Sequence, residues 1–232
     1  MMMTEILAVK LDARAAPARV RILDAAEWLF SLRGYHGVTI REITSAADTD
    51  VSAANYYFQS KENLFATVVM RRADEHSRSI SASLDRLEAA CGDTLPSVEA
   101  VIRAFVQPVI DKLARGGRGW RNYIHLLASM TNSQQNQAYV AVMNEVYDSV
   151  MRRVVGMFAA ALPQATSTSL YRSFHLMVGA LTHVYAETGG IERLSEGAVR
   201  SSDVDVMLDH LVPFLAAGVE RMSRPDAASS AS

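Results

Sequence analysis

The chain has 232 residues, of which 50% are hydrophobic and 21% are charged, and its formal net charge at pH 7 is −2. This composition is ordinary for a folded globular protein with one large domain or two small ones. It excludes the strongly basic balance that many nucleic-acid-binding proteins show, so any such surface must be a local patch. The single cysteine, Cys91, excludes an intrachain disulfide and favours a cytoplasmic location.

Residues 1–15 contain acidic side chains and no sustained apolar core, which predicts a flexible leader and not a signal peptide. The small, polar stretch 223–232 predicts a disordered tail. The most apolar helical run, 174–185, is too short to span a bilayer, so we expect no membrane association.

A first helix is predicted from Pro17, where apolar residues begin to recur at three- and four-residue steps. Arg33 and Gly34 end this helix, and Gly34 is well placed as a cap in the left-handed αL conformation. Thr39 and Glu42 have the spacing of a capping box, in which each side chain bonds to the backbone of the other, and they predict the start of a second helix.

Asp50 is a good N-cap for a third short helix, from Val51 to about Tyr57, and 48–50 forms the turn before it. Ser60 then caps a fourth helix of more than 25 residues. Further helices are predicted over 96–113, 120–130, 137–162, 168–187 and 203–222, with the clearest breaks at 115–119 and 161–169. The fold class is therefore all-α, with a small N-terminal domain over 16–76, a long connecting helix and a larger helical C-terminal domain over 77–222.

Two short helices joined by a tight turn, with a longer helix before them, are the parts of a helix-turn-helix DNA reader, here over 39–58. The second helix would enter the major groove. Ser52, Ala53 and Asn55 leave room for a close approach, and Asn55 can make paired hydrogen bonds to adenine. Val51 or Ala53 can contact a thymine methyl group.

Three aromatic residues follow in a row, Tyr56, Tyr57 and Phe58. Successive residues splay around a helix axis by about 100°, so one ring is buried while the others can be exposed. Phe58 is predicted to fill the core, which leaves the two tyrosine hydroxyls for phosphates or base edges, with Lys61 adding a positive charge. The alternative is a helix-turn-helix with a purely structural role.

The segment 37–65, GVTIREITSAADTDVSAANYYFQSKENLF, resembles the N-terminal domain of the TetR (tetracycline-repressor-like) family of bacterial transcription regulators. The positions that match the family pattern are Thr39, Arg41, Ile43, Ala47, Ser52, Tyr56, Phe58, Ser60, Lys61, Glu62 and Leu64. The resemblance implies that Arg41 reaches a base, and that Thr39, Tyr57 and Lys61 reach phosphates of an inverted-repeat operator in double-stranded DNA.

This chain departs from the family pattern in the turn. Asp48 replaces the usual glycine, and Thr49 replaces the usual apolar residue. Aspartate can adopt the left-handed conformation that such a turn needs. However, Asp48 and Asp50 also place negative charge beside the proposed DNA face.

The resemblance further implies a homodimer formed through the last two long helices and a pocket for a small-molecule effector. The dimer candidates are Leu170, Phe174, Met177, Leu181, Leu211 and Phe214, for which ordinary core packing is the alternative. The pocket candidates are Trp120, Arg121, Tyr123, His125, Met143, Tyr147, Met151 and Phe158. The 11 methionines suit an adaptable apolar cavity and equally suit a core.

The motif Asn55–Phe58 resembles that of family members that sense fatty acids or their thioesters, which favours a lipid-like effector as one hypothesis. His175, His183 and Glu187 have helical spacing, but packed or interface histidines are a better interpretation than metal ligands. We therefore expect no metal and no cofactor.

No catalytic signature is present, so we predict no catalytic residues and no enzyme activity. The prediction is a sequence-specific DNA-binding regulator, a repressor that a small, largely apolar effector releases from its operator. The alternative is an α-helical enzyme or scaffold protein that carries a structural helix-turn-helix.

Overall fold

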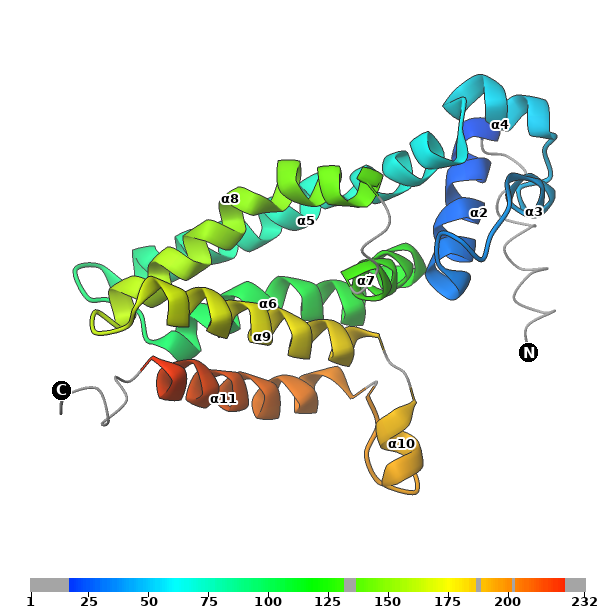
Figure 1. The fold of residues 1–232 in the computed structure, drawn as a ribbon. Coiled ribbons are helices and arrows are strands. Elements are labelled where there is room, and N and C mark those ends of the chain that lie inside the picture. Colours follow the sequence, from blue (N-terminus) through cyan, green and yellow to red (C-terminus); the bar gives the residue numbers. More distant parts are fainter. Residues whose placement is uncertain (1–16, 132–136, 187–188, 202, 224–232) are drawn as a thin grey trace. The chain divides into compact units, whose positions relative to one another are not determined.

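The computed structural model describes residues 17–131, 137–186, 189–201 and 203–223, and these residues form helices and no strand (Figure 1). The predicted leader, and all but the first residue of the predicted tail, lie outside the described residues. The helices are α2 (Ala18–Arg33), α3 (Ile40–Ala46), α4 (Val51–Phe58), α5 (Lys61–Cys91), α6 (Val98–Arg115), α7 (Gly117–Thr131), α8 (Gln137–Ala161), α9 (Ser167–Tyr185), α10 (Gly190–Leu194) and α11 (Val204–Met222).

Most helices begin and end close to the residues that the sequence predicts, and three details differ. Gly34 has the expected positive φ of 67°, but its ψ of 176° is extended and does not belong to an αL cap. The break predicted over 115–119 is shorter, because α7 already begins at Gly117. The short helix α10 was not predicted, since five residues are too few to show a periodic pattern.

The chain divides into two compact units, and the division does not follow the sequence order. Of the described residues, one unit holds those up to Ala73 together with those within Gly117–Asn144, and the other holds Asp74–Gly116 together with those within Glu145–Ser232. The sequence pattern predicts that residues 77–222 belong to the C-terminal domain. In the structure α7 instead joins the helix-turn-helix unit, because it packs against α2.

In the first unit, α2 packs against α3, α4 and α7 (Figure 1). Its core is built from side chains that the helical periodicity turns inward, among them Ile22, Phe30, Ile43 and Phe65. The rings of Phe30 and Phe65 meet edge to face with centroids 5.1 Å apart, a favourable aromatic arrangement. This core fixes the surface on which α3 and α4 lie.

A buried ion pair joins α2 to α5 inside this unit. The carboxylate of Glu27, whose relative exposure is 2%, accepts hydrogen bonds from Arg72 Nε at 3.0 Å and from Arg72 Nη2 at 3.2 Å. The Arg72 guanidinium also lies over the Trp120 ring of α7, 5.2 Å from its centroid. Gly119 lies beside the pair, where an added Cβ would overlap Arg72 Nη2. The pair therefore holds three helices together and leaves no space for a side chain at position 119.

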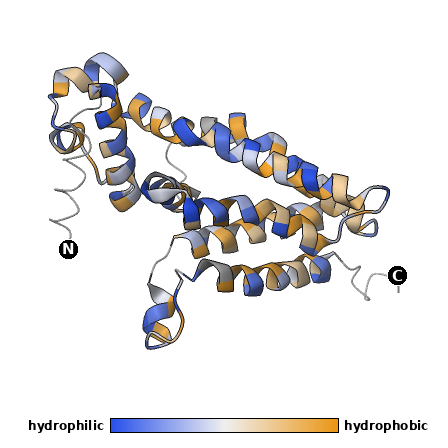
Figure 2. Cartoon of the chain, turned by 180° about the vertical axis from the view of Figure 1, so that it is seen from behind, coloured by the Kyte–Doolittle hydropathy of each residue, from blue (hydrophilic) through white to orange (hydrophobic). Residues whose placement is uncertain are grey.

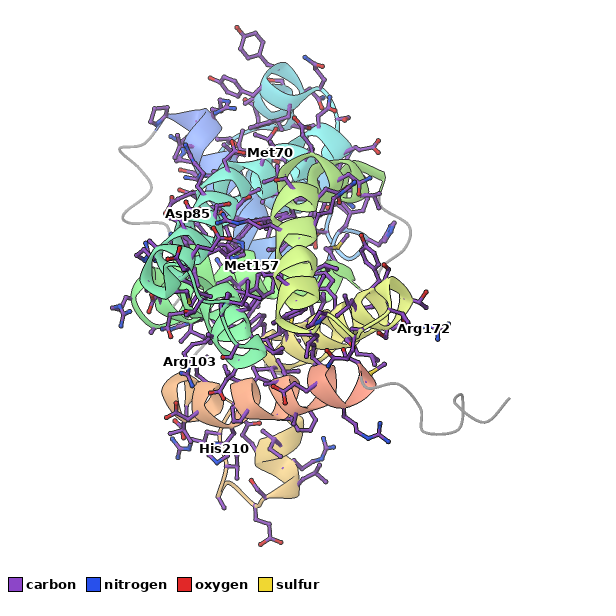
Figure 3. All side chains as sticks on the ribbon, turned by 90° about the vertical axis from the view of Figure 1, so that its left-hand side faces the viewer. Met70, Asp85, Arg103, Met157, Arg172 and His210 are labelled. Carbon is purple, nitrogen blue, oxygen red and sulfur yellow. The ribbon has the colours of Figure 1, made fainter. Side chains whose placement is uncertain are left out.

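In the second unit, α11 packs against α6 and α9. Arg103 of α6, labelled in Figure 3, pairs with Asp209 of α11 at 3.8 Å. Polar bonds join α5 to α8: Ser77 Oγ donates to the Val146 carbonyl at 2.9 Å, and Arg153 pairs with Asp85 at 2.7 Å.

One buried polar pair lies between α5 and α8. The Nδ1 atom of His76 is 2.7 Å from the Tyr147 hydroxyl. Burial, with a smaller contribution from the Lys112 ammonium, lowers the pKa of His76 to about 3. Burial therefore favours the neutral form of the His76 imidazole.

We expect the Arg72→Ala substitution to lower the free energy of unfolding by about 3–5 kcal/mol, because it leaves the Glu27 carboxylate buried without its partner. The matched control is Arg71→Ala, whose guanidinium pairs with Asp24 at an exposed position. That change should cost at most about 1 kcal/mol. Urea unfolding followed by far-UV circular dichroism, at one fixed protein concentration, measures both. Equal losses in the two variants would contradict the assigned role of the buried pair.

The pH dependence of the same variant gives a second readout. Burial raises the pKa of the Glu27 carboxyl above its ordinary value of 4.5, although Arg72 lowers it. Removing Arg72 raises this folded-state pKa further. Stability that depends on a raised carboxyl pKa is present below the unfolded value and is lost as pH rises. The Arg72→Ala variant should therefore lose stability more steeply than the unsubstituted chain as the pH rises above 4.5.

Candidate DNA-binding site

The first helix of the motif, α3, begins with the predicted capping box, which the structure confirms. Thr39 Oγ1 accepts from the Glu42 backbone N–H at 3.3 Å, and the Thr39 N–H donates to Glu42 Oε2 at 2.7 Å. Arg33, the last residue of α2, pairs with the same carboxylate at 2.8 Å. Bonds from Thr39 and then from Arg33 lower the pKa of Glu42 to about 2. The Thr39 hydroxyl donates its own proton to Glu42 at 2.7 Å, so in this conformation it caps the helix and has no proton left for a phosphate.

The turn between α3 and α4 is closed by backbone and side-chain bonds. The Thr49 N–H donates to the Thr44 carbonyl at 2.9 Å. Arg21 of α2 donates to the carbonyls of Ala47 at 3.0 Å and of Asp48 at 3.2 Å. Asp48 has a positive φ of 52°, the backbone conformation expected where the family pattern has glycine. The aspartate is therefore compatible with the turn.

The second helix of the motif, α4, is capped by Asp50 as predicted. Its carboxylate accepts from the Ala53 N–H at 2.8 Å and from the Ser52 hydroxyl at 2.5 Å. Ala54 and Phe58 are buried against the rest of the unit, which confirms Phe58 as a core residue. The opposite face of α4 is open, and it carries Val51, Ser52, Asn55, Tyr56 and Tyr57, while Ala53 is half-buried.

The two tyrosines differ in their exposure. Tyr56 is 80% exposed and Tyr57 is 39% exposed, and their rings meet edge to face with centroids 5.1 Å apart. Both rings are thus part of the exposed face of α4, together with the polar residues Ser52 and Asn55. Arg41, near the start of α3, is also exposed.

Lys61 begins α5 and is half-buried, which the sequence did not predict. Its ammonium lies 4.3 Å from the centroid of the Tyr35 ring, within the range of a cation–π contact. Burial lowers the pKa of Lys61. Ser60 caps the helix as predicted, accepting from the Asn63 N–H at 3.0 Å. Tyr35 is a site residue that no motif indicates, because it lies in the irregular segment between α2 and α3.

The predicted effector residues occur in both compact units. In the first unit Trp120 and Tyr123 are buried, His125 is half-buried and Arg121 is exposed. The side chain of Met143 lies outside the described residues. In the second unit Tyr147 and Phe158 are buried and Met151 is half-buried. The set is thus not gathered inside one unit, and the pocket stays a prediction.

The predicted dimer residues fall into two groups. Leu170, Met177, Leu181 and Leu211 are buried within this chain, a position from which they contact the core of their own unit and not a second chain. Phe174 is half-buried and its ring lies 6.3 Å from that of Phe105. Phe214 is 72% exposed. The core packing that was the alternative explanation for this stripe therefore accounts for most of these residues.

Among the described residues, no group of three or more histidine, cysteine, aspartate or glutamate side chains is arranged to hold a metal ion. His175 and His183 are both exposed on α9, and Glu187 lies outside the described residues. The same part of the chain has no helix both long and apolar enough to cross a membrane.

A capped helix pair with an open polar face, followed by a long helix and a helical second unit, defines the class of helix-turn-helix transcription regulators. Residues 22–68 match the family described as "Bacterial regulatory proteins, tetR family". Residues 103–218, half of the chain, match "Tetracyclin repressor-like, C-terminal domain". The chain belongs to the TetR family, whose members are DNA-binding transcription regulators and not enzymes.

The HTH-type transcriptional repressor NicS of Pseudomonas putida is 26% identical over 178 residues, which cover 74% of this chain and 77% of that protein. Shorter matches to two Bacillus subtilis regulators span about a third of those proteins. A TetR-like regulator from Rhodococcus sp. RHA1 has a similar fold, with a TM-score of 0.58, 19% identity and coverage of 89% of this chain and 95% of that one. The fatty acid degradation regulator FadR from Bacillus halodurans has a TM-score of 0.51, 15% identity and coverage of 87% and 95%.

We expect Lys61→Ala to weaken binding to every DNA sequence to a similar extent and to lower the salt dependence of log Kobs by roughly one unit, because the phosphate contact predicted for Lys61 would be lost. The control is Arg86→Ala, which removes an exposed cation of α5 outside the helix-turn-helix motif and should leave the salt slope unchanged. Fluorescence anisotropy on operator and random duplexes at several salt concentrations measures the slope. An unchanged slope for Lys61→Ala would show that its ammonium serves the Tyr35 ring alone.

Proposed function

We propose that this chain is a homodimeric repressor that binds an inverted-repeat operator and is released by a small, largely apolar effector. The observation that carries the proposal is the helix pair α3–α4. It is held by two capping arrangements and a bonded turn, while the face of α4 that bears Asn55 and Tyr56 stays open. A rigid pair with one open face is what insertion into a major groove requires.

The contact classes follow from the side chains on that face. We assign to Asn55 the reading of an adenine edge, and to Val51 and Ala53 the contact with thymine methyl groups. We assign the phosphate contacts, which fix the register on the duplex, to the hydroxyls of Tyr56 and Tyr57 together with Lys61. Arg41 supplies a donor group for a guanine edge or a phosphate from the start of α3.

A dimer through α9 and α11 is supported by the apolar side chains that these helices leave exposed. They are Tyr171 and Leu176 on α9, and Val206, Phe214 and Met222 on α11. Figure 2 shows hydrophobic residues recurring along both helices, and Figure 3 shows Arg172 of α9 extending away from the fold. A Cβ added at Gly179 meets no atom within 4 Å, which leaves space for a second helix to approach closely.

An effector in the second unit is supported by buried hydroxyls that lack a partner. Among the described residues, neither Ser173 Oγ nor the Tyr185 hydroxyl has a hydrogen bond, although both atoms are buried. Burial also raises the pKa of Tyr185. A buried polar atom without a partner needs an explanation, and a ligand with few polar atoms provides one.

A lipid-like effector fits this combination of an apolar interior and isolated hydroxyls. FadR, named above as a fatty acid degradation regulator, shares the fold, but at 15% identity the likeness concerns the fold alone. The support for a lipid-like molecule therefore comes from the residues of this chain. We place the protein in the bacterial cytoplasm, where its operator would lie.

The first test is a selection from random double-stranded DNA. We expect the enriched sequences to contain an inverted repeat whose half-sites are about 34–36 Å apart, or a multiple of one helical turn, because two recognition helices of a dimer must meet the same face of the duplex. Enrichment of a single half-site would contradict the dimer, and no enrichment at all would contradict sequence-specific binding.

The second test concerns release. An effector that prefers the DNA-free state weakens operator binding, and by linkage the operator must weaken effector binding by the same factor, typically about 5- to 150-fold. The measurement is a titration of medium- and long-chain fatty acids and their thioesters against the free protein and against the protein–operator complex. Equal affinities in the two titrations would exclude effector-driven release for these ligands.

A further inference from the structure

The first turn of α4 carries a carboxylate where a DNA reader ordinarily faces a polyanion. Asp50 is exposed, and the Ser52 hydroxyl and the Ala53 N–H both donate to its Oδ1 atom, at 2.5 Å and 2.8 Å. These bonds hold the side chain in one orientation at the N-terminus of the helix. They also lower the pKa of Asp50, the bond from Ser52 most strongly.

The bond from Ser52 changes what this turn can offer to DNA. A hydroxyl has one proton, and Ser52 gives it to Asp50. An ionised carboxylate has about four acceptor positions and no donor, so acceptor capacity remains after the helix bonds are made. Outward from the helix, the side chains of Asp50 and Ser52 therefore present acceptors only. Val51 between them is apolar.

An acceptor-only turn has a definite preference among the groups of a DNA duplex. It repels phosphate oxygens, so it does not serve as a phosphate anchor. In the major groove it repels the O6 and N7 acceptors of guanine and the O4 acceptor of thymine, and it attracts the amino donors of cytosine and adenine. Adenine also carries the N7 acceptor beside its amino group, whereas cytosine presents its amino donor without a neighbouring acceptor on the same base.

Since the N-terminal residues of a recognition helix contact the base edges, we propose that Asp50 is a specificity-determining residue that selects cytosine in each half-site by accepting from its N4 amino group. This inference rests on the proposed operator binding. It assigns a role in recognition to a residue whose charge would otherwise only oppose DNA binding. Asp50 thus lowers affinity for DNA in general and restores it at sequences with cytosine at the matching position.

The experiment is a parallel selection from random DNA with the unsubstituted protein, Asp50→Asn and Asp50→Ser. Asparagine and serine are good N-cap residues, so both variants keep the capping function and the fold. For the unsubstituted protein we expect one cytosine position per half-site, at which any other base weakens binding by on the order of tenfold or more. In both variants the penalty at that position should fall to about twofold or less, and the other positions should keep their preferences.

Asp48→Gly is the matched control, because glycine suits the φ of 52° and the change removes a nearby carboxylate outside α4. It should raise affinity for all sequences by a similar factor and keep the cytosine preference. If Asp50→Ser also raises affinity uniformly and keeps the preference, Asp50 is only a cap and a repelling charge, and the inference is overturned. If none of the four proteins enriches any inverted repeat, the proposed function fails as well.

Discussion

The buried pair of Glu27 and Arg72 is the constraint on which the DNA-binding unit depends, because it crosses three helices at once. Arg72 bonds to the carboxylate of α2 and lies over the Trp120 ring of α7, while Gly119 gives both groups room. A buried ion pair is weak evidence for net stability, but it strongly disfavours any arrangement that separates its members. Its contribution here is to specify one packing of α2, α5 and α7, and α2 in turn carries α3 and α4.

Hydrogen bonds and an ion pair nearer the surface attach α3 to α2. The carboxylate of Glu42 accepts hydrogen bonds from Thr39, the N-cap of α3, and from Arg33 of α2. Arg21 of α2 donates to the carbonyls of Ala47 and Asp48 and so closes the turn. Each of these bonds is exposed or partly exposed and contributes little alone. Together they attach α3 to α2 at both of its ends and attach the turn that leads into α4, so α3 and α4 are both held against α2.

The sequence predicts those features of the fold that depend on neighbouring residues. The helix starts at Thr39, Asp50 and Ser60 follow from capping chemistry, and the burial of Phe58 follows from helical periodicity. The sequence pattern does not predict contacts between residues that are far apart in the chain. Glu27 and Arg72 are 45 positions apart in the sequence. Glutamate and arginine ordinarily lie on the exposed face of an amphipathic helix, so the sequence does not indicate that these two are buried together. For the same reason the apolar stripe of α9 is compatible with both a dimer surface and core packing, because its sequence cannot show which apolar face meets the core.

The acidic turn shows how local geometry changes the meaning of a residue type. By charge alone, Asp48 and Asp50 disfavour DNA binding by this chain, whose net charge is −2. In the structure the backbone of Asp48 has the positive φ that the turn needs. The carboxylate of Asp50 accepts hydrogen bonds from the Ala53 N–H in the first turn of α4 and from the Ser52 hydroxyl. General affinity for DNA comes from positive charge, whereas discrimination comes from matched donors and acceptors at the base edges. Helix α4 contains no Lys or Arg. On the role proposed for Asp50, its fixed acceptor would therefore favour discrimination between sequences over general affinity for DNA.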